Sequence, residues 1–145
     1  MIPFFMRRAT ADDVNPVSKL LSSSKLPTEG VAESIDNFVI AEVGDAIVGA
    51  IGIEVYGRYG LLRSAVVAPE KQGQGIGHAL VGELLSKARS RGIASVYLLT
   101  TTAENYFPSF GFVRTDRKLV PSELGASAEL RGACPDTATV MRLDL

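Results

Sequence analysis

The pattern of hydrophobic and polar positions predicts a first half made mainly of strands. Four short runs rich in β-branched and aromatic residues are bounded by turn signals, which is typical of strands. They cover residues 4–8, 37–43, 46–55 and 61–67. The turn signals at 44–45 and 56–60 are short, so the last three runs should form an antiparallel meander.

Helical spacing predicts two main helices. Residues 10–21 begin with Thr10, a good N-cap, and continue with apolar positions three and four apart. Residues 75–90 carry a longer apolar stripe, and Gly92 marks the end of that helix. The first helix follows the first strand, and the second directly follows the meander.

The second half continues with alternating elements. The run 94–100 is a buried-looking strand, which should lie parallel to 61–67 because a right-handed crossover helix joins them. We then expect a short helix, a strand, a surface helix and a final strand, at 102–110, 112–115, 121–130 and 137–143. Without repeats or low-complexity linkers, the pattern predicts one domain over residues 1–145 with a mixed α/β sheet.

Composition and charge exclude several classes of protein. The chain has 145 residues and a formal net charge of -1, which disfavours a nucleic-acid binder. No apolar run approaches the roughly 18 residues of a membrane span. The single cysteine excludes an intrachain disulfide framework and fits a reducing compartment, so we expect a cytoplasmic protein. One cysteine and one histidine cannot supply a zinc site of three or four protein ligands, so no metal is expected.

A glycine-rich segment at 72–78 joins the last strand of the meander to the long helix. A helix N-terminus offers unpaired N–H groups and a partial positive charge, and glycines allow close approach, so this segment favours a phosphate or pyrophosphate. A Walker loop would need a terminal Gly-Lys-Ser/Thr, which is absent. A Rossmann fingerprint would need glycine at position 78, which is His78.

The segment instead matches the pattern Gln/Arg-x-x-Gly-x-Gly/Ala, and with its flanking elements it resembles the GCN5-related N-acetyltransferase (GNAT) superfamily. That resemblance implies a central mixed sheet of six to seven strands flanked by four to five helices. It implies acetyl-CoA as co-substrate, a small-molecule amine as partner, and a bulged strand before the loop. The acetyl-CoA-binding positions it implies are Ala65, Val66, Val67, Gln72, Gly73, Gln74, Gly75, Ile76, Gly77 and His78.

A closer resemblance concerns two groups of small enzymes. Segments at 56–57, 60–64, 98–103, 106–107 and 133–135 are similar to acetyltransferases of arsenic-resistance gene clusters, and some of them to amino-acid N-acetyltransferases. This implies acetylation of an amino-acid-like primary amine, with a role in resistance to arsenic or another toxic compound. Acetylation of a protein N-terminus and a non-catalytic acetyl-CoA-binding module are the alternatives. Homodimer formation stays open, because terminal strands in such folds often pair between subunits.

Two side chains are candidates for catalysis. Many family members have a tyrosine four residues before the glycine of Gly-Phe as general acid, but here that position is Phe107 and Tyr106 lies beside it. Tyr106 is therefore the candidate acid, against the alternative of a locally bonded, packed tyrosine. Glu54 is the candidate base, because it faces away from Ile53 on a strand beside the bulged one. A solvated residue at a strand end is the other interpretation of Glu54.

Two further side chains are candidates for binding the acceptor. Arg63 lies in an apolar strand, where it could bind a substrate carboxylate and could pair with Glu54; the two roles are compatible. Ser64, and more weakly Arg58, are candidates of the same kind. Cys134 has no histidine nearby in the sequence that would lower the pKa of its thiol, so we expect a buried residue rather than an acyl-cysteine nucleophile.

Overall fold

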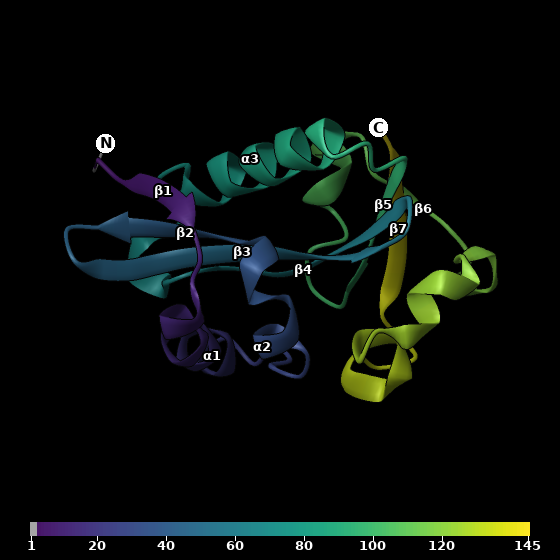
Figure 1. Ribbon diagram of the computed structural model, residues 1–145, viewed down its shortest axis with the longest axis horizontal. Coiled ribbons are helices and arrows are strands. Elements are labelled where there is room, and N and C mark those ends of the chain that lie inside the picture. The colour runs from purple at the N-terminus through teal and green to yellow at the C-terminus, as the bar shows by residue number, and fades with distance from the viewer. Residues whose placement is uncertain (1–2) are drawn as a thin grey trace.

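The computed structural model describes residues 3–145, which form a seven-stranded mixed sheet in the order β1-β2-β3-β4-β5-β7-β6 (Figure 1). This agrees with the six to seven strands implied by the family resemblance. Strands β1 to β4 form an antiparallel meander, as predicted from the short turns between them. The strands are β1 Phe5–Arg8, β2 Phe38–Val43, β3 Ala46–Tyr56, β4 Tyr59–Val67, β5 Ser95–Thr100, β6 Val113–Arg114 and β7 Thr139–Asp144.

Helices cover both faces of the sheet (Figure 1). The long helix α3, Ile76–Ser90, packs on one face and contributes its apolar stripe to the larger hydrophobic core. Helices α1, Val14–Ser23, and α2, Val31–Ser34, lie on the other face over a second core. None of the helices formed by residues 3–145 has both the length and the apolar character that a membrane span requires.

Two predicted helices differ from the structure. In 102–110 only Phe107–Phe110 is helical, as a 3₁₀ turn. Before it, the Thr100 hydroxyl accepts hydrogen bonds from two backbone N–H groups and holds the chain in a non-helical turn. The predicted surface helix 121–130 consists of a 3₁₀ helix, Ser122–Ala126, and an irregular helical turn, Glu129–Ala133.

The segment 122–133 is also not confined to the surface. The Leu124 side chain is fully buried against β4, β5 and β7, and the Glu129 side chain is buried as well. The scarcity of large apolar residues in this segment suggested an exposed helix. One leucine and one carboxylate are enough to attach it to the sheet on the side of α1 and α2 (Figure 1).

The two central strands β4 and β5 are parallel, as predicted, but they pair over only three residues each. Tyr59 to Leu61 lie opposite Ser95 to Tyr97, and no pairing continues beyond Leu61. Beyond that point β4 remains paired with β3, and β5 remains paired with β7. The sheet therefore opens between β4 and β5 toward the N-terminus of α3, and the backbone edges of both strands are exposed there.

A β-bulge lies on β4 where the strands separate. Gly52 pairs with Arg63 and Ala50 pairs with Val66, so two residues of β4 lie opposite Ile51. The backbone of Ser64 has φ +60°, a left-handed value that is uncommon outside glycine. The extra residue makes Arg63 and Val66, three positions apart, face the same side of the sheet. The bulge implied by the family resemblance is thus present.

Candidate active site

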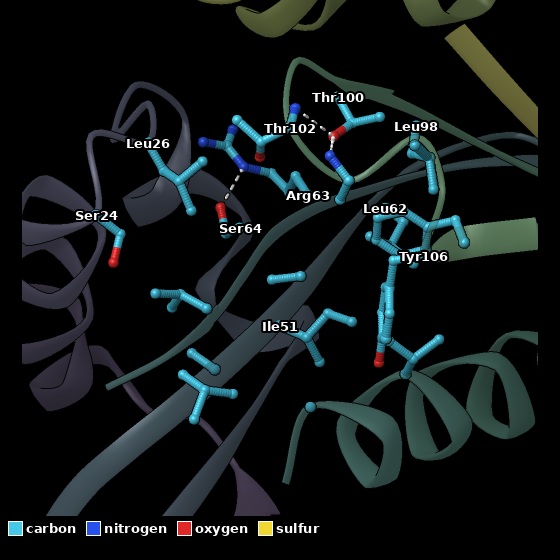
Figure 2. Close-up of a pocket in the computed structure, with 18 of the residues that line it drawn as sticks. Ser24, Leu26, Ile51, Leu62, Arg63, Ser64, Leu98, Thr100, Thr102 and Tyr106 are labelled. Atoms are coloured by element: carbon cyan, nitrogen blue, oxygen red, sulfur yellow. Dashed lines mark hydrogen bonds between the residues drawn. The ribbon is translucent and has the colours of Figure 1, made fainter. Parts of the chain in front are cut away.

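The opening between β4 and β5 continues into a cavity of about 950 Å³ (Figure 2). One end is formed by the glycine-rich loop and the start of α3. The other end is formed by the loop after α1 and by the segment that contains Glu129. Residues 62–67 of β4 and 98–103 after the paired part of β5 form its two walls. The cavity thus joins the predicted anion site to the region of Arg63.

The glycine-rich loop is shaped by backbone conformations that favour glycine. Gly73 and Gly75 have φ +81° and +86°, and no atom lies within 4 Å of a Cβ built on either residue. Conformation, rather than crowding, therefore requires glycine at these two positions. At Gly77 a Cβ would stand 3.6 Å from Val67 and 3.7 Å from the Tyr106 hydroxyl, filling the narrow space between α3 and β4.

These features fit a pyrophosphate at the start of α3, where the first N–H groups of a 15-residue helix are unpaired within it. Most of the predicted loop residues line the cavity: Gln72, Gly73, Gly75, Ile76, Gly77 and His78. Gln74 is the exception, because it is not part of the cavity lining and its side-chain Oε1 is buried without a hydrogen-bond partner.

The backbone of β4 also fits an extended ligand. The Ala68 N–H donates to the Val48 carbonyl across the β3–β4 pair. Because successive N–H groups of a strand point in opposite directions, the Val67 N–H points toward the open edge and the Val66 N–H points toward β3. The Val67 carbonyl accepts a hydrogen bond of 3.0 Å from the Gln72 side chain, which fixes the loop against the strand end. Ala65, Val66 and Val67 all line the cavity.

Three buried charged residues lie at the far end of the cavity, and we call Arg63, Glu54 and Glu129 the buried cluster. Arg63 Nη1 lies 2.6 Å from Glu54 Oε2, so the predicted pair between neighbouring strands is present. The other oxygen of Glu54 accepts a hydrogen bond of 2.5 Å from the Tyr56 hydroxyl. Arg63 lines the cavity, whereas Glu54 lies behind it and is not part of the lining.

Glu129 is the member of the buried cluster that the sequence pattern did not indicate. Its Oε2 lies 3.5 Å from Arg63 Nε, and its side chain is 5% exposed. Burial raises the pKa of the Glu129 carboxyl to about 7, and the Arg63 charge opposes that rise. In the sequence, Glu129 is a single acid among small residues, which does not by itself indicate a functional site. Its burial depends on how segment 122–133 packs against the sheet.

Cys134 is buried, as predicted, and lies beside Glu129. Burial, together with the neighbouring Glu129 carboxylate, raises the pKa of the Cys134 thiol to about 12. The thiol is thus protonated near neutral pH, which argues against a nucleophilic thiolate. Among residues 3–145, no group of three or more histidine, cysteine or acidic side chains is arranged to hold a metal ion.

Tyr106 lies on the cavity wall opposite Arg63, and its hydroxyl points toward the first turn of α3 (Figure 2). Desolvation raises the pKa of the Tyr106 hydroxyl, which keeps it protonated. The neighbouring Phe107 is buried and packs edge-to-face on Phe112, with ring centroids 5.6 Å apart. This chain has Phe107 at the position where many family members have a tyrosine. The neighbouring Tyr106 nevertheless brings a hydroxyl near the start of α3.

The remaining candidates divide between the cavity and the surface. Ser64 lines the cavity and its hydroxyl accepts a hydrogen bond of 2.9 Å from Arg63 Nε (Figure 2). Arg58 is exposed, lies over the Tyr59 ring and does not line the cavity. The structure therefore brings Arg63, Ser64 and Tyr106 to one cavity, leaves Glu54 behind it, and adds Glu129.

Residues 34–114, more than half of the chain, match the sequence profile of the acetyltransferase (GNAT) domain. Among curated proteins, the amino-acid acetyltransferase of Mycobacterium tuberculosis is 31% identical over 129 residues, which cover 82% of this chain and 74% of the relative. The amino-acid acetyltransferase of Ralstonia nicotianae is 30% identical over 128 residues; the match covers 82% of this chain but only 28% of that longer relative.

Solved structures show the same architecture. Rv2747 from Mycobacterium tuberculosis, solved in complex with CoA, has a TM-score of 0.79 and 25% identity, with 97% of this chain and 99% of that chain covered. N-acetylglutamate synthase from Neisseria gonorrhoeae, solved with CoA and N-acetyl-glutamate, has a TM-score of 0.84 and 20% identity. The match covers 100% of this chain and 36% of that longer chain. The chain belongs to the GNAT acetyltransferase family, whose members are N-acetyltransferases that use acetyl-CoA as donor.

Proposed function

We propose that the protein transfers an acetyl group from acetyl-CoA to the primary amine of a small amino-acid-like molecule. The observation that carries this proposal is the continuous cavity from the glycine-rich loop to the buried cluster. It offers an anion site for the donor at one end and charged groups for a polar acceptor at the other. The relatives named amino-acid acetyltransferases support the choice of acceptor.

Each part of the cavity has a distinct task in this proposal. Acetyl-CoA supplies an activated acetyl group as a thioester. The amides of 72–78 hold its pyrophosphate, and the open edge of β4 aligns the arm that leads to the thioester. We assign the stabilisation of negative charge on the thioester oxygen to the backbone N–H groups of Val67 and Ala65. We assign the protonation of the departing sulfur to the Tyr106 hydroxyl, whose raised pKa keeps it protonated.

The acceptor carboxylate needs a cation, and Arg63 is already engaged with two carboxylates of the buried cluster. Lys25 is a better candidate for this task. It lines the cavity, is exposed, and has a left-handed backbone with φ +59° in the loop after α1. We assign the acceptor carboxylate to Lys25, which revises the substrate role first considered for Arg63.

A thiol-release assay with acetyl-CoA tests the proposal across a panel of acceptors. The panel contains L-glutamate, L-glutamine, L-aspartate and glycine, with ethylamine as a matched amine without a carboxylate and a short peptide as the N-terminal alternative. Turnover of at least one amino acid, and preference for it over ethylamine, is expected. Turnover of the peptide alone would favour protein N-terminal acetylation. Stabilisation by CoA without turnover of any amine would favour a non-catalytic binding module.

The resemblance to enzymes of arsenic-resistance clusters supports a narrower proposal, that the physiological acceptor is a toxic amino acid with an arsenic-containing side chain. Such an analogue belongs in the same panel. Expression in an arsenic-sensitive bacterial strain should raise the tolerated concentration of that compound. Equal tolerance with wild-type protein and with a Gly75→Trp variant, whose side chain would obstruct the loop, would overturn the role in resistance.

A further inference from the structure

Glu129 is held at the cavity by local hydrogen bonds. Its backbone N–H donates to the Ser127 hydroxyl at 3.2 Å, and its carbonyl accepts from the Cys134 N–H at 3.2 Å. Leu124 anchors the preceding 3₁₀ helix in the core between β4, β5 and β7. The carboxyl is thereby fixed over the sheet on the side of Arg63, and it lines the cavity.

The two carboxylates of the buried cluster have unequal partners. Both oxygens of Glu54 are engaged, by Arg63 Nη1 at 2.6 Å and by the Tyr56 hydroxyl at 2.5 Å. Glu129 lies 3.5 Å from Arg63 Nε, which donates its hydrogen bond to Ser64 instead, at 2.9 Å. Glu54 therefore neutralises most of the Arg63 charge. Glu129 is the carboxylate that faces the cavity and keeps capacity to accept a proton.

Ser64 connects this cluster to the reaction centre. Ser64 has a left-handed backbone and is part of the bulge, and the open edge of β4 begins beside it. Arg63 Nε bridges the Ser64 hydroxyl and the Glu129 carboxyl, so the carboxyl lies beside the bulge. An acceptor amine that approaches a thioester aligned on the open edge of β4 from the far end of the cavity would pass Glu129.

We propose that Glu129 is the general base of the reaction, with Glu54 and Arg63 as the fixed pair that positions it. This inference rests on the proposed function, which supplies the acetyl donor and the amine acceptor. It replaces the role predicted for Glu54, because Glu54 lies behind Arg63 and both of its oxygens have partners. It assigns a task to a segment, 122–133, that the sequence pattern placed on the surface.

In the proposed step the acceptor ammonium loses two protons. The acceptor ammonium gives one proton to the Glu129 carboxylate, and its nitrogen lone pair forms a bond with the acetyl carbon. The carbon–sulfur bond breaks, and the sulfur leaves with that electron pair. Tyr106 gives its proton to the departing sulfur, and the second proton that leaves the nitrogen as the amide forms restores the Tyr106 hydroxyl. The proton held by Glu129 then passes to solvent, so the products are the acetylated amine, CoA as a thiol and one proton.

The surroundings of Glu129 support this task. The charged and titratable groups that face it are Arg63 on β4, Glu54 on β3, Cys134 after its own turn, and Glu29 near α2. Burial outweighs the attraction of Arg63, and Glu54 adds repulsion, so the pKa of Glu129 is raised to about 7. A base with a pKa near the working pH combines a large deprotonated fraction with useful basicity.

The test compares the wild-type chain with Glu129→Gln, Glu129→Asp and the matched control Glu123→Gln. Glu123 lies six residues earlier in the same segment and its side chain is exposed. For each protein, kcat/KM is measured from about pH 5 to pH 9 with the panel amino acid that the wild type acetylates fastest. CoA affinity is measured by calorimetry as a readout that the base should not affect.

The wild-type rate should rise with pH through an apparent pKa near 7, because the carboxylate form is the active one. Glu129→Gln should lose about 10²- to 10⁴-fold in kcat and should lose the inflection of kcat/KM near pH 7, with CoA affinity unchanged. The rise that remains in this variant should follow the deprotonation of the acceptor ammonium itself, toward higher pH. Glu129→Asp should keep a rise with pH at a reduced rate, and Glu123→Gln should match the wild type.

Full activity of Glu129→Gln, or an unchanged rise with pH in that variant, would overturn the role of Glu129 and leave the proposed function intact. Equal loss of CoA affinity and of rate in Glu129→Gln would indicate a structural role and would also overturn it. A wild type that binds CoA but acetylates no amine would overturn the proposed function, and with it the base.

Discussion

Two clusters in this protein have the same composition, one arginine and two carboxylates, and opposite surroundings. We call Arg7, Asp13 and Glu42 the surface cluster. Arg7 lies 2.8 Å from both carboxylates and its side chain is 36% exposed. In the buried cluster the Arg63 side chain is 0% exposed. The surface cluster joins β1, the first helical turn and β2. The buried cluster lies at the end of the cavity.

The contrast appears in how the carboxyl groups titrate. Hydrogen bonds from Arg7 lower the pKa of Asp13 to about 2, because they outweigh desolvation. Burial raises the pKa of Glu129 to about 7, because Arg63 makes its close contact with Glu54. Direct hydrogen bonds from an arginine thus favour the ionised form of Asp13, whereas the longer contact from Arg63 does not offset the burial of Glu129. In the buried site Glu129 is left able to exchange a proton near neutral pH.

The largest effect is expected for Arg63→Met, which leaves two buried carboxylates without their cation. We expect the free energy of unfolding to fall by about 3–5 kcal/mol near pH 8, where Glu129 is ionised in the wild type. Urea unfolding measures this loss, which should be smaller near pH 5, where Glu129 is protonated. A loss below about 1 kcal/mol at both pH values would contradict the assignment of a buried, interacting cluster.

Glu129→Gln should change how stability depends on pH. The folded pKa of Glu129 is about 7 against an ordinary 4.5, so its contribution is full below about pH 4.5 and is lost as pH rises through 7. Wild-type stability should therefore fall by about 2–3 kcal/mol from this group between about pH 5 and pH 8. Glu129→Gln should not show that fall, and Glu123→Gln should keep it. Identical pH profiles for wild type and Glu129→Gln would show that the carboxyl titrates normally.

Gly30→Ala tests how tightly the buried cluster is packed. A Cβ at Gly30 would stand 2.7 Å from Arg63 Nη1, and the backbone φ is +85°. We expect a loss of about 2–3 kcal/mol, from conformational strain and displacement of the guanidinium. Gly57→Ala is the matched control, because Gly57 has φ +63° with no atom near its Cβ, and should lose about 1–2 kcal/mol. If thermal unfolding gave the same loss of stability for Gly30→Ala and Gly57→Ala, the Arg63 side chain would move aside without cost and the cluster would not be tightly packed.

The smallest effect is expected for Arg7→Met in the surface cluster. The guanidinium of Arg7 and the carboxylate of Glu42 are partly exposed, whereas Asp13 is buried. Exposed ion pairs contribute about 0–1 kcal/mol each, so we expect a total loss of about 1–2 kcal/mol at neutral pH. Because the folded pKa of Asp13 is lowered from 3.8, its contribution is present above that pH and disappears as pH falls through about 2. Unfolding free energies of variant and wild type should therefore converge in acid. A loss as large as that of Arg63→Met would remove the contrast between the clusters.

The loop and helix on which the predicted donor site rests are both present in the structure. Gln72 to Gly77 and the helix after it are contiguous, so one short segment carries both the conformation and the unpaired N–H groups that favour an anion. The pairing of Glu54 with Arg63 was also among the predicted alternatives, because alternation along two strands joined by a short turn fixes which side chains share a face. The roles of the individual residues remain predictions.

The acceptor half depended on contacts between distant segments. Glu129 meets Arg63 across 66 positions of the chain, after a segment whose weak apolar pattern gave no indication of burial. This contact between Glu129 and Arg63 places Glu129, rather than Glu54, as the carboxylate that faces the cavity. The position of Tyr106 also needed the structure, because a non-helical turn after β5 rather than a regular helix sets the direction of its side chain.

The sequence by itself determined the order of elements, the meander, the glycine-rich loop before the long helix and the family, because each is encoded by neighbouring residues and by the periods of strands and helices. Only the tertiary structure decided where β4 and β5 separate, which carboxylate lies behind Arg63, and how far each is removed from water. Burial depends on all segments packed around a group. The titration of Glu129, and the base we assign to it, therefore follow from the assembled fold rather than from any local pattern.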